Sequence, residues 1–241
     1  MKHDDMFADP HAHIGAFCFD KQVTQVFADM IRRSVPGYGL SLEMLTLIAA
    51  EYAQEGSHIY DLGCSLGAST LAVRQGIQAP SCHIFAIDNA PAMIEQCQAY
   101  IDADTAPTPV TLQCADIQNI TINNASIVIL NFTLQFIPIQ ERQALLTHIA
   151  SGLREGGILV LSEKVCFDDA TENQRNIALH EGFKRSQGYS DIEISQKRQS
   201  LEHVLIPETL ATHHQRLHDA GFKHSQTWFQ CFNFSSILAF K

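Results

Sequence analysis

The sequence has no long apolar run and lacks the features that mark exported or membrane proteins. No stretch of its 241 residues approaches the about 18 uninterrupted apolar residues of a membrane span, and the first residues lack the basic and apolar regions of a signal peptide. Its seven cysteines, an odd number, are scattered without a CxxC spacing, which is typical of reduced thiols and indicates no disulfide framework. We therefore expect a soluble, cytoplasmic protein without membrane contacts.

Basic residues are also scarce. Sixteen lysines and arginines against 26 acidic residues give a formal net charge of −10, which opposes the phosphate neutralisation on which most nucleic-acid binding depends. We therefore expect no direct binding to RNA or DNA. A local basic patch, Lys184-Arg185 with Lys197-Arg198, leaves open the attraction of a small anion.

No internal repeat or low-complexity linker divides the chain, so we expect a single domain over residues 1–241. Apolar strand-like segments alternate with helical segments over residues 56–163, which is typical of a βαβ series and a largely parallel sheet. The predicted strands are 58–62, 82–88, 111–116, 126–133 and 158–163, and the predicted helices between them are 66–77, 90–103 and 138–153. This pattern predicts an α/β, Rossmann-like core.

The two ends of the chain add further elements to this core. Residues 1–55 are expected to form an N-terminal helical arm, with a turn at Val35-Pro36-Gly37-Tyr38-Gly39 before a helix that Ser41 caps. Residues 164–222 are expected to form a helical cover, with helices over about 169–201 and about 207–220. Residues 223–241 contain two consecutive strand-like runs, which predict an antiparallel hairpin at the edge of a seven-stranded sheet.

The loop after the first strand lacks one glycine of the nicotinamide dinucleotide fingerprint. Gly63 and Gly67 are present, but Ser65 occupies the position of the middle glycine, so a pyrophosphate-containing cofactor is disfavoured. An adenosyl amino acid needs no such phosphate site, and Asp88 at the end of the next strand is predicted to accept hydrogen bonds from its ribose hydroxyls. Simple turns at the glycines and a helix cap at Asp88 remain alternatives.

Two further polar residues end strands of the predicted sheet. Ligands of open α/β sheets bind beyond the carboxyl ends of the strands, which favours a ligand role for Asp116, although a turn role is equally compatible with its position. Asn131 is polar within an apolar run, so it either finds buried partners or faces the ligand crevice, and we favour the crevice. Phenylalanines such as Phe132 and Phe136 more often fill the core, and no role is assigned to them.

Residues 56–163 resemble the class I S-adenosylmethionine-dependent methyltransferases. The resemblance depends on the order of Asp-Leu-Gly-Cys at 61–64, the acids Asp88 and Asp116, and Arg-Glu-Gly-Gly at 154–157. It implies S-adenosylmethionine as the cofactor and leaves the reaction undetermined.

A closer resemblance, to the carboxy-S-adenosylmethionine synthases, extends over nearly the whole chain. It is carried by the segments 31–38, 61–68, 131–136, 195–198 and 228–234. This family converts S-adenosylmethionine and prephenate to carboxy-S-adenosylmethionine and phenylpyruvate, and the product serves a separate tRNA carboxymethyltransferase that modifies wobble uridine. The resemblance also implies a homodimer.

The resemblance implies ligand contacts at ten residues: Tyr38, Gly63, Cys64, Ser65, Asp88, Asn89, Asp116, Ile117, Asn131 and Arg198. Arg198 is implied to bind the extra carboxylate of the product through two parallel hydrogen bonds, in its own or a neighbouring subunit's pocket. A solvated arginine on a helix surface is the alternative. The implied mechanism removes a proton from the methyl carbon beside the sulfonium and captures carbon dioxide from prephenate there; no side chain is identified as the base.

Other chemistry is less well supported by the sequence. His11 with His13, and His214 with His218, lack a matched third ligand, so we expect no metal site. Cys64 lacks a nearby basic partner and is interpreted as a packing residue and not as a nucleophile. An ordinary small-molecule methyltransferase and a non-catalytic cofactor-binding module remain the alternative functions.

Overall fold

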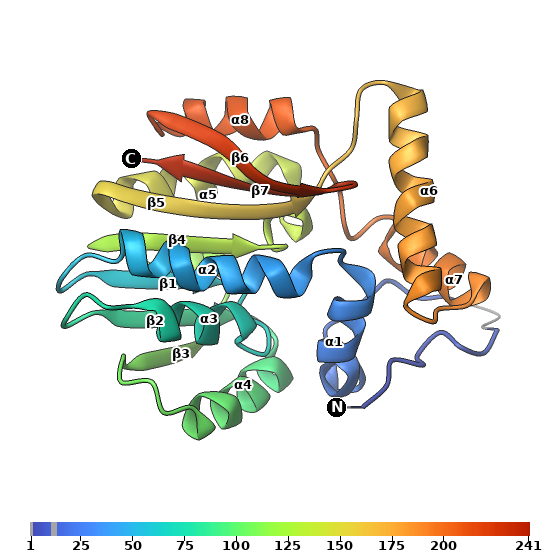
Figure 1. Cartoon of the computed structure of the whole chain (residues 1–241), viewed down its shortest axis with the longest axis horizontal. Helices are drawn as coiled ribbons and strands as arrows, with labels where there is room; N and C mark the ends of the chain where they lie inside the picture. Colours follow the sequence, from blue (N-terminus) through green and yellow to red (C-terminus); the bar gives the residue numbers. More distant parts are fainter. Residues whose placement is uncertain (1, 11–13) are drawn as a thin grey trace.

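The computed structural model describes residues 2–10 and 14–241, which build a mixed sheet with helices on both faces (Figure 1). Its strand order is β3-β2-β1-β4-β5-β7-β6. The strands are β1 (His58–Leu62), β2 (His83–Asp88), β3 (Val110–Cys114), β4 (Ala125–Asn131), β5 (Leu153–Lys164), β6 (His224–Cys231) and β7 (Phe234–Phe240). The first five pair in parallel, whereas β7 runs antiparallel to both β5 and β6. The predicted edge hairpin and the predicted fold class are confirmed.

Helices cover the two faces of the sheet because each presents an apolar side to it. The helices are α1 (Lys21–Ser34), α2 (Tyr38–Tyr52), α3 (Ala68–Gly76), α4 (Pro91–Ala103), α5 (Ile139–Gly152), α6 (Ala170–Ser186), α7 (Asp191–Leu201) and α8 (Leu210–Asp219), with short 3₁₀ turns η1 (Ile117–Asn119) and η2 (Leu134–Phe136). Side chains of α2, α3 and α4 pack with one face of the strands, and those of α5 and α8 pack with the other. None of the helices in the described part of the chain combines the length and apolarity needed to cross a membrane.

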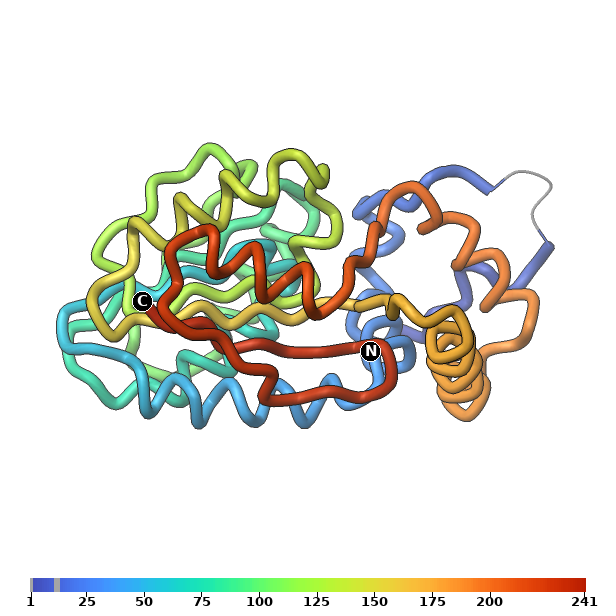
Figure 2. Tube along the Cα trace, turned by 90° about the horizontal axis from the view of Figure 1, so that it is seen from above, coloured from blue at the N-terminus to red at the C-terminus, as the bar shows by residue number. Residues whose placement is uncertain are grey.

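The remaining helices stand at the carboxyl ends of the parallel strands. Figures 1 and 2 show α1, α6 and α7, together with the N-terminal residues, beside the sheet instead of over its faces. We call α1, α6 and α7 the cap. Arg33 of α1 joins its parts, since its Nε donates to the Gln187 carbonyl at 2.8 Å and its guanidinium carbon lies 3.9 Å from the centroid of the Tyr189 ring. The Tyr189 hydroxyl in turn donates to Asp4.

Two expectations about the ends of the chain need correction. The helix expected to start at Ser41 starts at Tyr38, because Gly37 precedes it in the left-handed conformation with φ 77°. The helix expected within the helical cover 164–222 does not belong to the cap: α8 packs against α5 and β6 in the layer on the sheet. Only α6 and α7 of that region stand over the strand ends.

Candidate functional site

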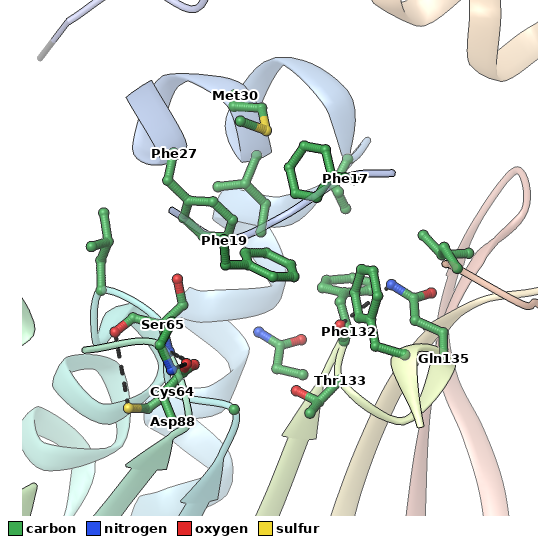
Figure 3. A pocket seen from close by; sticks show the side chains of 18 of the residues that line it. Phe17, Phe19, Phe27, Met30, Cys64, Ser65, Asp88, Phe132, Thr133 and Gln135 are labelled. Atoms are coloured by element: carbon green, nitrogen blue, oxygen red, sulfur yellow. Dashed lines mark hydrogen bonds between the residues drawn. The ribbon is translucent and has the colours of Figure 1, made fainter. Parts of the chain in front are cut away.

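A cavity of about 700 Å³ lies between the carboxyl ends of the strands and the cap. Its walls include the ends of β2 and β4, the loop after β1, and residues of α1, α6 and α7. Figure 3 shows Asp88, Cys64 and Ser65 on one side of this space, Phe132 and Gln135 on the other, and side chains of the N-terminal region above. This is where parallel α/β sheets place their ligands.

The glycine loop after β1 turns sharply and presents backbone to the cavity. The amides of Gly63 and Cys64 both donate to the Ile87 carbonyl of β2, at 2.8 and 2.9 Å. Gly63 has φ 82°, and a Cβ at this position would lie 2.5 Å from the Thr133 side chain. A glycine is therefore required by the conformation and by the space.

Asp88 connects this loop to the start of α4. One carboxylate oxygen accepts from the Ser65 amide at 2.8 Å, and the other accepts from the Ala90 amide at 2.9 Å. Burial raises the pKa of Asp88, and the amide hydrogen bonds oppose this rise. Ala90, and not Asp88, is the N-cap residue of α4, and each Asp88 oxygen retains acceptor capacity toward the cavity that Asp88 lines.

Asn89 and Asp116 form a pair beside Asp88. The Asn89 side-chain amide donates to Asp116 Oδ1 at 2.8 Å. Asn89 and Ile117 line the cavity. Asp116 does not line it and is connected to it only by its hydrogen bond with Asn89. Asp116 therefore orients a neighbour of the cavity in this structure.

Asn131 at the end of β4 carries an unused acceptor. Its Nδ2 donates to Ser69 Oγ at 2.9 Å, which fixes the orientation of the amide. Its Oδ1 is buried and has no hydrogen-bond partner within the described residues, although Asn131 lines the cavity. A buried acceptor without a partner is costly, so this oxygen suits a ligand that supplies an N–H or O–H donor.

Aromatic rings close the cavity on the side of the cap. Tyr38 lines the cavity from the first turn of α2, and burial raises the pKa of its hydroxyl, so it is neutral. Phe132 and Phe136, to which the sequence analysis assigned no role, also line the cavity. Phe136 packs edge-on against Phe19 with centroids 5.4 Å apart, and the sequence pattern missed this because the contact joins residues distant in the chain.

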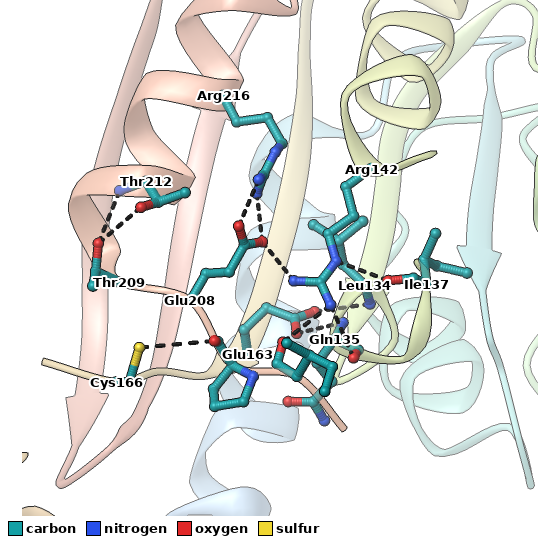
Figure 4. A network of polar contacts seen from close by, with 12 residues as sticks. Leu134, Gln135, Ile137, Arg142, Glu163, Cys166, Glu208, Thr209, Thr212 and Arg216 are labelled. Atoms are coloured by element: carbon teal, nitrogen blue, oxygen red, sulfur yellow. Dashed lines mark hydrogen bonds and ion pairs between the residues drawn. The ribbon is translucent and has the colours of Figure 1, made fainter. Parts of the chain in front are cut away.

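A buried polar network holds the wall that follows Asn131 (Figure 4). The two carboxylate oxygens of Glu163 accept from the amides of Leu134 and Gln135 at 2.9 and 2.8 Å. The fully buried Arg142 donates to the Gln135 carbonyl at 3.1 Å, and Gln135 Oε1 accepts from the Lys164 amide at 3.0 Å. The end of β4 and the end of β5 are thereby fixed relative to one another.

Three lysines line the cavity where the end of β5 meets the cap: Lys164 at the end of β5, Lys184 on α6 and Lys197 on α7. We call these three residues the lysine wall. The basic patch noted in the sequence is divided by the structure. Lys184 and Lys197 line the cavity, whereas Arg185 and Arg198 pair with Glu181 at 3.5 and 3.1 Å. The sequence analysis missed Lys164. A charged residue at the end of an apolar strand could have indicated a position at the ligand-binding edge of the sheet.

Arg198 is placed outside the cavity of its own chain. Its side chain is 67% exposed, and its Nη1 lies 3.1 Å from Glu181 Oε1. All other predicted ligand residues except Asp116 line the cavity. Within one chain the structure thus gathers these residues around one cavity and leaves Arg198 on the surface.

Comparisons with known proteins identify the family. Relatives named carboxy-S-adenosyl-L-methionine synthase include those of Geobacter metallireducens, 58% identical, and Geobacter sp. strain M21, 56% identical; each match covers all of this chain and 99% of the relative. The relative of that name in Escherichia coli O17:K52:H18 is 54% identical, over all of this chain and 98% of its own length. The chain belongs to the carboxy-S-adenosyl-L-methionine synthase family. It is therefore an enzyme of the S-adenosylmethionine-dependent class.

Other comparisons place this carboxy-S-adenosyl-L-methionine synthase family member on the methyltransferase fold. A family model described as a methyltransferase domain matches residues 59–157. A putative O-methyltransferase from Nostoc punctiforme aligns with a TM-score of 0.63 at 17% identity, over 92% of this chain and 60% of its own. Human N-acetylserotonin methyltransferase, solved in complex with S-adenosylmethionine, aligns with a TM-score of 0.61 at 18% identity, over 92% of this chain and 55% of its own.

The cavity residues fit S-adenosylmethionine. The carboxylate of Asp88 suits ribose hydroxyls, and the partnerless Asn131 Oδ1 suits a donor such as the ligand's ammonium group. Cys64 is not suited to nucleophilic chemistry, because the hydrogen bond with Cys97 and burial raise the pKa of its thiol.

The histidine pairs considered as metal ligands do not assemble a site in the described part of the chain. There, no three or more histidine, cysteine or acidic side chains are placed so that they could hold a metal ion. Both ring nitrogens of His214 contact hydroxyls of β6, Ser225 at 2.7 Å and Thr227 at 3.1 Å. His11 and His13 lie outside the described residues.

Proposed function

We propose that this enzyme makes carboxy-S-adenosylmethionine and phenylpyruvate from S-adenosylmethionine and prephenate. The single observation that carries the proposal is a cavity with two chemically different halves. Asp88 and Asn131 provide acceptors for a nucleoside and an amino acid at one side, while Lys164, Lys184 and Lys197 provide positive charge at the other. The full-length similarity to carboxy-S-adenosyl-L-methionine synthases supports the same reaction.

The proposed reaction needs positioning and the exclusion of water more than it needs a reactive side chain. When prephenate becomes aromatic it loses carbon dioxide and hydroxide; the hydroxide takes a proton from the methyl carbon beside the sulfonium, and that carbon bonds to the carbon dioxide. Phe19 and Phe136 close the cavity with apolar surface, which limits the water that would compete for this carbon. The Glu163 network keeps the strand ends, and hence the two ligands, in a fixed relation.

We also propose that the enzyme works as a homodimer in which Arg198 reaches the cavity of the partner subunit. Support comes from its position: Arg198 is exposed on α7 and does not line the cavity of its own chain. A guanidinium binds a carboxylate through two parallel hydrogen bonds, as the added carboxylate of the product requires.

The product is proposed to pass in the cytoplasm to a separate tRNA carboxymethyltransferase that modifies wobble uridine. The net charge of −10 supports a division of labour in which this chain does not itself bind tRNA.

Isotope tracing tests the proposed reaction. Purified enzyme is incubated with S-adenosylmethionine and with prephenate that carries carbon-13 only in its ring carboxylate. Mass spectrometry should find the label in a nucleoside heavier than S-adenosylmethionine by one carbon dioxide unit, with an equal amount of phenylpyruvate. S-adenosylhomocysteine together with a methylated acceptor would instead identify an ordinary methyltransferase, and retention of the cofactor without turnover would identify a binding module.

A further inference from the structure

The lysines of the cavity wall are unusually buried for ammonium groups. Lys184 and Lys197 are 8% and 6% exposed, and Lys164 is partly buried. Charged lysines are rarely buried without a partner, because removing an ammonium group from water is unfavourable unless an opposite charge compensates. Three such groups in one cavity therefore call for anions.

The anions of the protein itself satisfy only one of the three. Lys197 Nζ lies 3.0 Å from Ser34 Oγ and 3.6 Å from Asp4 Oδ2. Glu181 is the acid whose field reaches both Lys164 and Lys184, but its carboxylate already pairs with Arg185 and Arg198.

Two ammonium groups are thus left without a direct partner. Within residues 2–10 and 14–241, neither Lys164 Nζ nor Lys184 Nζ forms a salt bridge or a hydrogen bond. The neighbouring His180 adds no negative charge, since its Nε2 lies 2.8 Å from the Ser34 carbonyl and burial lowers the pKa of its ring to about 3. The cavity wall therefore carries two amino groups that pair directly with no acid of the described residues.

The position of these charges separates them from the nucleoside half. Asp88 ends β2 and Lys164 ends β5, and the sheet order β2-β1-β4-β5 puts three strand spacings, about 14 Å in total, between them. Asn131, at the end of β4, lies between these two ends. A ligand held by Asp88 and Asn131 consequently leaves the lysine wall for a second molecule.

We propose that Lys164 and Lys184 form a subsite for a small dicarboxylate, one ammonium group for each carboxylate, with Lys197 strengthening the positive potential behind them. The inference rests on the proposed function in one respect: that function supplies prephenate as the dicarboxylate. The apolar surface of Phe132 and Phe234 beside the lysines suits the six-carbon ring of prephenate, which carries both carboxylate-bearing groups on one ring carbon. Ion pairs in such a partly dry cavity are stronger than at an exposed surface.

Binding without turnover tests the subsite. S-adenosylhomocysteine replaces S-adenosylmethionine, so no methyl group is available for reaction, and calorimetry measures prephenate binding to the complex of the enzyme with S-adenosylhomocysteine. We expect Lys164→Met and Lys184→Met each to raise the dissociation constant of prephenate about 10-fold or more, and the dissociation constant of S-adenosylhomocysteine less than about 2-fold. Arg175→Met removes a positive charge from the exposed side of the same helix, α6, and should change neither constant.

The outcomes separate this proposal from the proposed function. Equal weakening of both ligands, or no effect on prephenate, would overturn the subsite even if the wild-type enzyme makes the carboxylated product. Selective weakening would support it even if the wild-type enzyme gave no product. If circular dichroism shows that a methionine variant does not fold, Lys184→Gln and Lys184→Arg are measured in its place. The subsite then requires that Lys184→Gln loses prephenate affinity and that Lys184→Arg retains it.

Discussion

The carboxylate of Asp88 accepts a hydrogen bond from the backbone amide of Ser65 at 2.8 Å. This contact fixes the acid at the end of β2 to the glycine loop after β1, two segments separated by α3. The nucleoside half of the cavity is therefore organised before a ligand arrives, which reduces the entropy cost of binding.

Replacing this acid should weaken cofactor binding selectively. In Asp88→Asn the side-chain oxygen can accept from only one of the two backbone amides, and the NH₂ group faces the other. The negative charge is also lost, so the ribose hydroxyls lose an ionised acceptor. We expect the dissociation constant of S-adenosylmethionine to rise about 10- to 100-fold, measured by calorimetry. Asp102→Asn, on the exposed surface of α4, is the matched control. An unchanged constant for Asp88→Asn would restrict this residue to a structural role.

Asn131 allows a separate test of the amino-acid end of the ligand. Asn131→Ala removes the partnerless buried oxygen, and we expect it to raise the dissociation constant of S-adenosylmethionine about 5- to 50-fold. Ser69→Ala removes only the group that accepts from Asn131 Nδ2 and should have a smaller effect. If Ser69→Ala were as damaging as Asn131→Ala, the free oxygen would not be a ligand contact.

The parallel core and the nucleoside half were predictable because short-range patterns encode them. The apolar strands ending at Leu62, Asp88 and Asn131 place their carboxyl ends at one edge of a parallel sheet, so polar residues there converge whatever the loop lengths. The left-handed turn at Gly63 was likewise visible as a glycine after a strand.

The side of the cavity that the cap forms was less predictable, because its contacts join helices that are distant in the sequence and mostly polar. The sequence of α6 and α7 has no strong apolar stripe, so it does not indicate that Lys184 and Lys197 face inward while the adjacent arginines face outward. The start of α2 at Tyr38 depends on Gly37, where a Cβ would lie 2.5 Å from the Phe229 ring of β6. Such a constraint arises only in the folded chain.

The lysine wall should make prephenate binding sensitive to pH. Burial, followed by the charges of Lys197 and Lys164, lowers the pKa of Lys184 to about 7; Glu181 opposes this shift and Arg198 adds to it. Below about pH 7 the group is protonated and binds an anion, and above it the neutral amine predominates. KM for prephenate should therefore be constant at the acid side and rise above about pH 7, by up to about 10-fold per pH unit.

Controls for this profile use a charge that does not titrate. In Lys184→Arg the guanidinium stays protonated, so the first rise should disappear and leave the later rise due to Lys197, whose pKa burial lowers to about 8. The dissociation constant of S-adenosylhomocysteine should stay flat over the same range. A profile in Lys184→Arg identical to that of the wild type would assign the titration to another group.

Arg198 offers the sharpest test of the proposal that two subunits share a site. Arg198→Ala and Asp88→Ala should each be nearly inactive alone, but a mixed dimer unites an intact Asp88 cavity with the partner subunit's Arg198. Random mixing should restore about a quarter of wild-type activity, since half the dimers are mixed and each has one complete site. Mixing Asp88→Ala with Asn131→Ala, two lesions of the same cavity, should restore none. If native mass spectrometry shows mixed dimers of the first pair without recovered activity, Arg198 serves its own chain, and the exposed pairing with Glu181 must then break for it to reach the cavity.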